Sequence, residues 1–254
     1  MAESDTRQAM SIISEQAIIG RNVQIGHFTT IYPNVEIAAD VIIGDNCIIG
    51  HPAGETGAEP LFIGPGSVIR SHTILYEGSY FAQGLQTGHH VLIREGTRTG
   101  LDPHIGSFSD IEGRCTIGDY ARFHSYVHIG IGSRIGHFVK IYPLVTLTND
   151  PLPPSHIVKP VTIEDGVVLC VGVTVLPDAV MRRGSYAAAG AIVGGEIPVG
   201  AIVADKESRI AGHVRNLMNL AAGIRHPWMR HFADGYPPEA RERIEQLGRS
   251  ILNQ

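Results

Sequence analysis

Apolar residues recur at every sixth position through most of this chain. The series starts at Ile19, Ile25 and Ile31, is interrupted twice, and ends at Val199. Only Thr87 and Thr99 among its 28 positions are not apolar. A helix repeats every 3.6 residues and a strand every two, so neither gives this spacing. The pattern predicts a repeat architecture in which each repeat buries one large side chain.

A second set of small or β-branched residues follows four positions after most of these anchors. Val23 stands in this relation to Ile19, and Val127 to Phe123. Between the two sets lie glycine or short polar residues that suit a tight corner, as at 44–46. Each hexapeptide is therefore predicted to form a short strand and a turn, with the anchor and the small residue facing inward. Three hexapeptides would close one triangular coil.

These features predict an all-β fold, the left-handed parallel β-helix. We expect about nine coils stacked at roughly 4.8 Å, followed by a C-terminal α-helical tail. The left-handed coil is one of the rare exceptions to right-handed crossover connections. The expected organisation is an N-terminal segment at 1–18, the β-helix at 19–204 and the helical tail at 205–254.

Two insertions interrupt the repeat. The first, at about 50–62, contains the sequence HPAGETGAEP, and the second, at about 148–162, contains several prolines. Prolines restrict the backbone and stiffen an extended arm. Loops that leave a rigid solenoid are where such proteins place their binding surfaces. We expect both insertions, the second above all, to contribute to function.

The period stops after Val203. Residues 208–223 are predicted to form one helix, and Glu239–Leu252, which follows two prolines, a second. Ile244, Leu247 and Ile251 form an apolar stripe on the second helix. The tail is expected to cap the open end of the solenoid or to pack on a neighbouring subunit.

Composition narrows the function classes. A net charge of −5 and an isoelectric point near 6.2 argue against nucleic acid as a partner. Cys47 and Cys115 occupy inward positions, which is typical of reduced cysteines in a cytoplasmic protein. We expect no membrane span, because no apolar run approaches the ~20 residues that one needs.

Histidines are concentrated in the middle of the chain. On a coil of three hexapeptides, residues 18 apart share a column, so His72 lies beneath His90, and Asp110 beneath His128. A neutral imidazole is a natural general base near neutral pH. Since no triad-like spacing supports a covalent nucleophile, the simpler mechanism is direct attack by an acceptor whose proton a histidine removes.

Several segments resemble the hexapeptide-repeat acyltransferases. These are LTNDPLPPS and the long segment IEDGVVLCVGVTVLPDAVMRRGSYAAAGAIVGGEIPVGAIVADKESRI. RFHSYVHIG is similar to the acceptor-site coil of members that N-acetylate nucleotide-linked amino sugars. QTGHHVLIRE is similar to a motif of hexapeptide sugar acetyltransferases. The resemblance covers residues 19–210.

The resemblance implies a homotrimer that binds acetyl-CoA, the acyl donor, in a cleft between subunits and needs no metal. It implies a nucleotide sugar as acceptor and a cytoplasmic location. The implied catalytic base is His124, with His90 and His104 next. The implied substrate-binding residues are Tyr126, Asn149, Asp150 and His89. The implied cofactor-binding residues are Gly172, Ala188, Ala189, Gly190, Lys206 and Arg209.

Three alternatives stay open at this stage. An O-acetyl- or O-acyltransferase acting on a sugar hydroxyl would share the fold, the donor and the histidine. A γ-type carbonic anhydrase would use the same prism with three histidines on zinc between subunits. A scaffold without catalytic activity would leave the histidines as surface residues. The insertion at 50–62 and the long tail depart from the family pattern and leave the acceptor's identity open.

Overall fold

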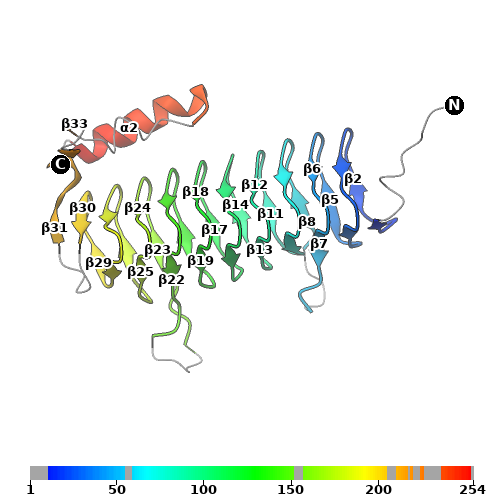
Figure 1. Ribbon diagram of the computed structural model, residues 1–254, viewed down its shortest axis with the longest axis horizontal. Coiled ribbons are helices and arrows are strands. Elements are labelled where there is room, and N and C mark those ends of the chain that lie inside the picture. The colour runs from blue at the N-terminus through cyan, green and yellow to red at the C-terminus, as the bar shows by residue number, and fades with distance from the viewer. Residues whose placement is uncertain are drawn as a thin grey trace.

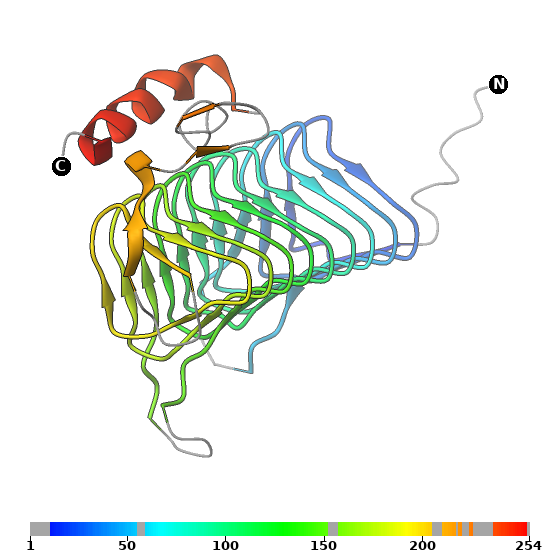
Figure 2. The ribbon, with the colours of Figure 1, turned by 60° about the vertical axis from the view of Figure 1, so that its left-hand side comes forward.

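The protein is a long three-sided prism built from stacked coils (Figures 1 and 2). The computed structural model describes residues 11–54, 59–151, 157–204, 210–216, 218–219, 224–225 and 236–252. Each coil contributes one strand to each of three parallel sheets, called sheets A, B and C. This arrangement confirms the predicted left-handed parallel β-helix.

The three sheets run the length of the prism, with strands three apart in sequence lying side by side. Sheet A contains β1 (Ile12–Ile13), β4 (Thr30–Ile31), β7 (Ile48–His51), β10 (Ile74–Tyr76), β13 (Leu92–Ile93), β16 (Asp110–Ile111), β19 (His128–Ile129), β22 (Thr146–Leu147), β25 (Thr174–Val175) and β28 (Ile192–Val193). Sheet B contains β2 (Ile18–Ile19), β5 (Val35–Ile37), β8 (Leu61–Ile63), β11 (Tyr80–Phe81), β14 (Arg98–Thr99), β17 (Thr116–Ile117), β20 (Arg134–Ile135), β23 (Thr162–Ile163), β26 (Val180–Met181) and β29 (Glu196–Ile197). Sheet C contains β3 (Gln24–Ile25), β6 (Ile42–Ile43), β9 (Val68–Ile69), β12 (Gln86–Thr87), β15 (His104–Ile105), β18 (Arg122–Phe123), β21 (Lys140–Ile141), β24 (Val168–Leu169), β27 (Tyr186–Ala187), β30 (Ala201–Val203) and β31 (Ile210–His213).

The hexapeptide pattern accounts for this geometry. Val127 and Ile129 are buried in the interior, while His128 between them faces outward. The turn after each strand commonly contains a residue with positive φ, which closes the corner. The two non-apolar anchors, Thr87 and Thr99, face inward like the others and are buried. The apolar core is therefore one continuous column from end to end.

The coils begin and end differently from the expected series. Residues of 11–18, expected to precede the solenoid, supply β1 and the start of β2. At the other end the last repeat is two residues short, so Ile197 is buried in place of the predicted anchor Val199. Gly195, with a φ of 67°, makes this tighter corner.

The tail differs from the prediction in its first half. Residues 210–213 form β31, which pairs antiparallel with β30, followed by the short 3-10 helix η2 (Val214–Asn216). Two short strands, β32 (Met218–Asn219) and β33 (Ile224–Arg225), then pair with each other. The described residues of this range thus do not form the predicted α-helix, because the open edge of sheet C offers backbone partners to the returning chain.

The second tail helix is confirmed. A 3-10 turn, η3 (Pro238–Ala240), leads into α2 (Arg241–Leu252). Figure 1 shows α2 lying along the C-terminal coils. The helix buries Ile244 and Ile251 in a second apolar cluster that includes Tyr120 and Phe138 from the prism.

Candidate functional site

The three corners of the prism carry different residues. The C–A corner is the set of turns that lead from strands of sheet C to strands of sheet A; the A–B and B–C corners are defined in the same way. At the C–A corner His72, His90, Phe108 and Tyr126 stack in one row, with ring centroids 4.5 to 4.9 Å apart. All four have positive φ and are exposed. Two predicted site residues, His90 and Tyr126, thus belong to an aromatic row.

A hollow of about 420 Å³ lies beside this row. Its polar lining residues are Arg70, Gln86, Thr87, His89, His104, Ser107, His124 and Ser125. The structure therefore brings together three of the predicted site residues, His89, His104 and His124. They come from successive coils, which the 18-residue spacing of the sequence placed at the same corner.

His124 stands at the C-terminal end of the hollow, directly after β18. Its ring stacks on Tyr142 with the centroids 4.7 Å apart. Partial burial, helped by the positive charge of Lys140, lowers the pKa of the imidazole below its ordinary value of 6.5. The ring therefore stays neutral near pH 7, as a general base requires.

The other two histidines of the hollow have polar partners. The Nε2 atom of His104 lies 3.3 Å from a carboxylate oxygen of Asp102, which also pairs with Arg122 at 2.5 Å. Partial burial acts to raise the pKa of Asp102, but the hydrogen bonds from His104 and Arg122 outweigh it and lower that pKa. His89 shares a hydrogen bond of 2.7 Å between Nδ1 and the Ser71 hydroxyl. Both rings are thus held in place, whereas His124 is oriented by stacking.

The predicted cofactor-binding residues lie farther along the same corner. Gly172, Ala188, Ala189 and Gly190 follow strands β24 and β27 of sheet C. A Cβ atom added at Gly172 or Gly190 would meet no other atom within 4 Å, so the corner is open there. Lys206 and Arg209 lie outside the described residues.

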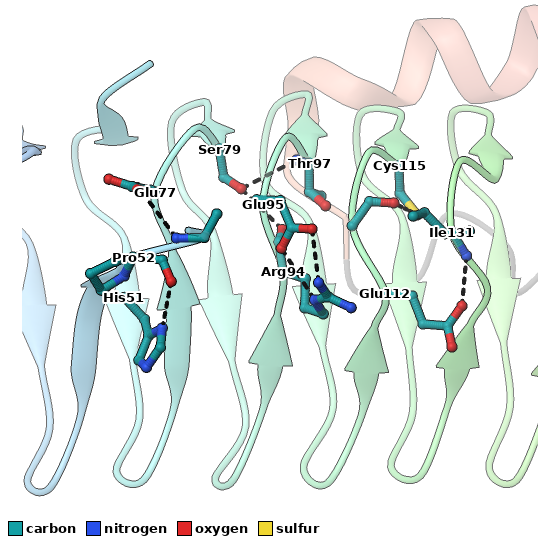
Figure 3. A network of polar contacts seen from close by, with 12 residues as sticks. His51, Pro52, Glu77, Ser79, Arg94, Glu95, Thr97, Glu112, Cys115 and Ile131 are labelled. Carbon is teal, nitrogen blue, oxygen red and sulfur yellow. Dashed lines mark hydrogen bonds and ion pairs between the residues drawn. The ribbon is translucent and has the colours of Figure 1, made fainter. Parts of the chain in front are cut away.

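Asn149 and Asp150 follow β22 and lie at the A–B corner, where both long insertions leave the prism (Figure 1). The Asn149 amide donates to Glu112 at 2.8 Å, and Glu112 also accepts the backbone N–H of Ile131 at 2.9 Å (Figure 3). Glu77 accepts the N–H of Ala53 at the root of the first insertion. One chain therefore does not bring Asn149 and Asp150 together with His124.

A histidine outside the predicted set lies close to Asn149. His128 Nδ1 is 3.4 Å from Asp110, and its Nε2 is 3.6 Å from Glu112. The hydrogen bond with Asp110 raises the pKa of His128, which favours an imidazolium that pairs with both carboxylates. The cluster holds the base of the second insertion. The 18-residue spacing pairs Asp110 with His128 in the sequence, but nothing in it points to Glu112.

Arg70 is a charged residue of the hollow that the sequence analysis did not single out. It lies in the same column as His124, three coils nearer the N-terminus. Two features of the sequence together could have indicated Arg70. Thr87 is a polar residue at an anchor position that is usually apolar, and Arg70 lies one coil before it.

The described residues include no group of three or more His, Cys, Asp or Glu side chains placed to hold a metal ion. Within that part of the chain, no helix is both long and apolar enough to span a membrane.

Comparison with known sequences identifies the repeat type. Residues 25–54 match the family described as bacterial transferase hexapeptide (six repeats). The chain is 27% identical over 184 residues to the bifunctional protein GlmU of Geobacillus sp., and 26% identical over 203 residues to GlmU of Mycolicibacterium smegmatis. These alignments cover 72% and 79% of this chain.

The chain resembles the hexapeptide-repeat acyltransferases. It spans only 38% and 39% of the length of those two GlmU proteins. Among solved structures, LpxA from Acinetobacter baumannii matches with 16% identity and a TM-score of 0.39, covering 97% of this chain and 91% of that one. LpxA from Bacteroides fragilis, a UDP-N-acetylglucosamine acyltransferase, matches with 14% identity and a TM-score of 0.38, covering 95% and 90%.

Proposed function

We propose that this protein is an acetyltransferase that moves the acetyl group of acetyl-CoA to the amino group of a nucleotide-linked amino sugar. The observation that carries the proposal is His124, a neutral imidazole at the end of a polar hollow. The resemblance to hexapeptide-repeat acyltransferases supports the class of reaction.

In the proposed reaction the neutral sugar amine attacks the thioester carbon, and a nitrogen–carbon bond forms. His124 accepts the proton that the amine loses. When the carbon–sulfur bond breaks, the thiolate of coenzyme A takes that proton, so His124 returns to its neutral form. Holding both substrates at one place supplies much of the acceleration, because it removes the entropy cost of their encounter.

The two substrates would approach His124 from opposite ends of the C–A corner. The polar hollow lies on its N-terminal side and suits the acceptor sugar. Gly172, Ala188, Ala189 and Gly190 lie on its C-terminal side, where small residues leave room for the pantetheine arm of the donor. Lys206 and Arg209 are proposed to meet the phosphates of the coenzyme.

We also propose that the active unit is a homotrimer. Asn149 and Asp150 leave the A–B corner, whereas His124 lies at the C–A corner. Contact between these groups would require that the insertion of one subunit reach the hollow of its neighbour. Size measurement by light scattering tests the trimer. Mixed trimers of His124→Ala and Asn149→Ala chains test the shared site, since such trimers would regain activity at interfaces free of both changes.

The decisive test is release of free thiol from acetyl-CoA with a panel of nucleotide-linked amino sugars and hydroxyl-only analogues. Release with amino sugars alone is expected. Release with hydroxyl acceptors would replace the proposal with O-acylation. No release from any of them, together with no acetyl-CoA binding by calorimetry, would overturn the acyltransferase proposal.

A further inference from the structure

One irregularity in the hydrogen-bond ladder lies at the N-terminal end of the hollow. In regular coils the residue after a sheet C strand donates its N–H to the anchor carbonyl of the next coil: Gly44 donates to Ile69 and Gly88 to Ile105, both at 2.7 Å. Arg70 instead donates its N–H to the Thr87 hydroxyl at 3.0 Å. The polar residue at this buried anchor thus replaces a backbone acceptor.

This exchange leaves the Thr87 carbonyl available to the Arg70 side chain. The Nη1 atom of Arg70 donates to that carbonyl at 2.6 Å. The bond lays the guanidinium over the next coil, toward His124. A buried threonine therefore fixes the orientation of an exposed arginine.

The column that joins Arg70 to His124 carries no side chain between them. The two residues between them in the column are Gly88 and Gly106, where a Cβ would strike Ser107 and the backbone of His124 respectively. Arg70 and His124 are three coils apart, about 14 Å, and the guanidinium lies one coil closer, so about 10 Å separates it from the His124 coil. A hexose with the phosphate on its anomeric carbon fits that span.

Within the described part of the chain, the Arg70 guanidinium forms no ion pair. The described residues place no carboxylate within ion-pair distance of it, and it is the only arginine or lysine lining the hollow. A second hollow of about 840 Å³ continues on its N-terminal side and shares Arg70 and His89 with the first. Asp45 lines that second hollow, where its carboxylate accepts the His27 N–H at 2.7 Å.

We propose that Arg70 binds the diphosphate of a nucleotide-linked acceptor, with the sugar toward His124 and the nucleoside in the second hollow. An arginine in a fixed orientation suits this ligand, because its planar fork matches phosphate oxygens. The direction of the sugar rests on the proposed function, whereas recognition of the diphosphate does not.

The test is calorimetric binding of UDP, GDP and inorganic pyrophosphate, without any acyl donor. Binding of at least one is expected, and Arg70→Gln should weaken it about 10- to 100-fold, since it removes a charge-assisted hydrogen bond. Arg98→Gln is the matched control: Arg98 is an exposed arginine of sheet B that packs over Tyr80. It should bind the diphosphate as the wild type does.

Thr87→Val keeps the shape of the anchor and removes its hydroxyl. The Arg70 N–H can then bond the backbone carbonyl, as in other coils, and the guanidinium loses its support. Weaker diphosphate binding with an unchanged thermal midpoint is expected. If the wild type binds none of these anions, or Arg70→Gln binds them equally well, the proposal is wrong. Loss of binding in Arg70→Gln without any acetyl transfer would sustain this inference and refute the proposed function.

Discussion

Arg70 and His124 occupy a column that the coils between them fill with glycine. Glycine is needed there because the next coil lies too close for a Cβ atom. At Arg70 the regular ladder is altered, because the Thr87 hydroxyl replaces a backbone acceptor. His124 keeps the regular bond and donates its N–H to the Ile141 carbonyl at 2.8 Å. Departures from the local rule are expected where function requires them. Arg70 and His124 lie at the two ends of the hollow.

Replacing His124 should separate catalysis from folding. His124→Ala is expected to lower turnover by about 10²- to 10⁴-fold, the usual contribution of a general base. Its thermal midpoint should stay close to that of the wild type, because the ring is exposed. His51→Ala at the A–B corner is the control. Turnover of His124→Ala within a few-fold of wild type would remove His124 from the mechanism.

The pH dependence of kcat/KM tests the same residue independently. A base works only when deprotonated, and the pKa of His124 is lowered from 6.5, so activity should persist below pH 6.5 before it falls. Lys140→Gln removes a positive charge that helps to lower this pKa. The acid limb should then move to higher pH. If the acid limb lies above pH 6.5 and does not move in Lys140→Gln, His124 is not the group that titrates.

Part of this residue-level arrangement follows from counting along the sequence. The 18-residue column spacing predicts that His89, His104 and His124 lie near one another. The spacing did not reveal Arg70. The Arg70 side chain is oriented by its hydrogen bond to the Thr87 carbonyl, and that carbonyl is available only because the Arg70 N–H bonds the Thr87 hydroxyl instead. The spacing also did not show that Asn149 binds Glu112, since the insertion obeys no period.

At the level of elements, the tail helix α2 is fixed to the prism at the B–C corner. Arg243 pairs with Asp119 at 2.8 Å and lies over the rings of Tyr120 and Phe138. Tyr236 packs edge-on against the same two rings. The contact joins the end of the chain to coils far earlier in the sequence.

Acidification should loosen this contact. Partial burial acts to raise the pKa of Asp119, but the Leu101 N–H and the Arg243 guanidinium outweigh it and lower that pKa below 3.8. The stabilisation is therefore present above pH 3.8 and is lost as pH falls through the lower value. The protection of the α2 amides against hydrogen exchange, relative to the intrinsic rate at each pH, should fall there. In Asp119→Asn the amides should exchange faster at neutral pH, and this acid step should be absent.

The two halves of the tail show what element prediction depends on. The apolar stripe and the two prolines predict α2, because both signals are local. Residues 210–213 form a strand because β30 leaves an unpaired edge, a partner that local sequence does not display. Both insertions leave the A–B corner, because each follows a strand of sheet A. A glutamate of the prism accepts a hydrogen bond from the start of each insertion, Glu77 from Ala53 and Glu112 from Asn149.

On the scale of the whole molecule, each coil contacts only its neighbours, so stability is close to a sum over coils. Leu75 is fully buried, and Leu75→Ala should cost about 2–5 kcal/mol in the free energy of unfolding. Ile18 is 63% exposed in the first coil, and Ile18→Ala should change it by no more than about 0.5 kcal/mol. Urea denaturation measures both. Similar effects of the two changes would contradict the inward and outward assignment.

The global fold is the level at which the sequence is most informative. Twenty-eight anchor positions follow the same six-residue period, so a departure at one of them does not change the predicted fold. The ends are less predictable, because a terminal coil lacks a neighbour on one side and its period relaxes, as at Ile197.

Because every coil has the same rise, distances between residues of one column at the C–A corner are multiples of about 4.8 Å. Arg70 and His124 are separated by a whole number of coils, so adding or removing one full turn of 18 residues between them changes their distance by about 4.8 Å and leaves their directions the same. An acceptor longer or shorter by a matching amount would then present its reactive group to His124. Substrate length in such a protein can be set by the number of turns, without redesign of either end.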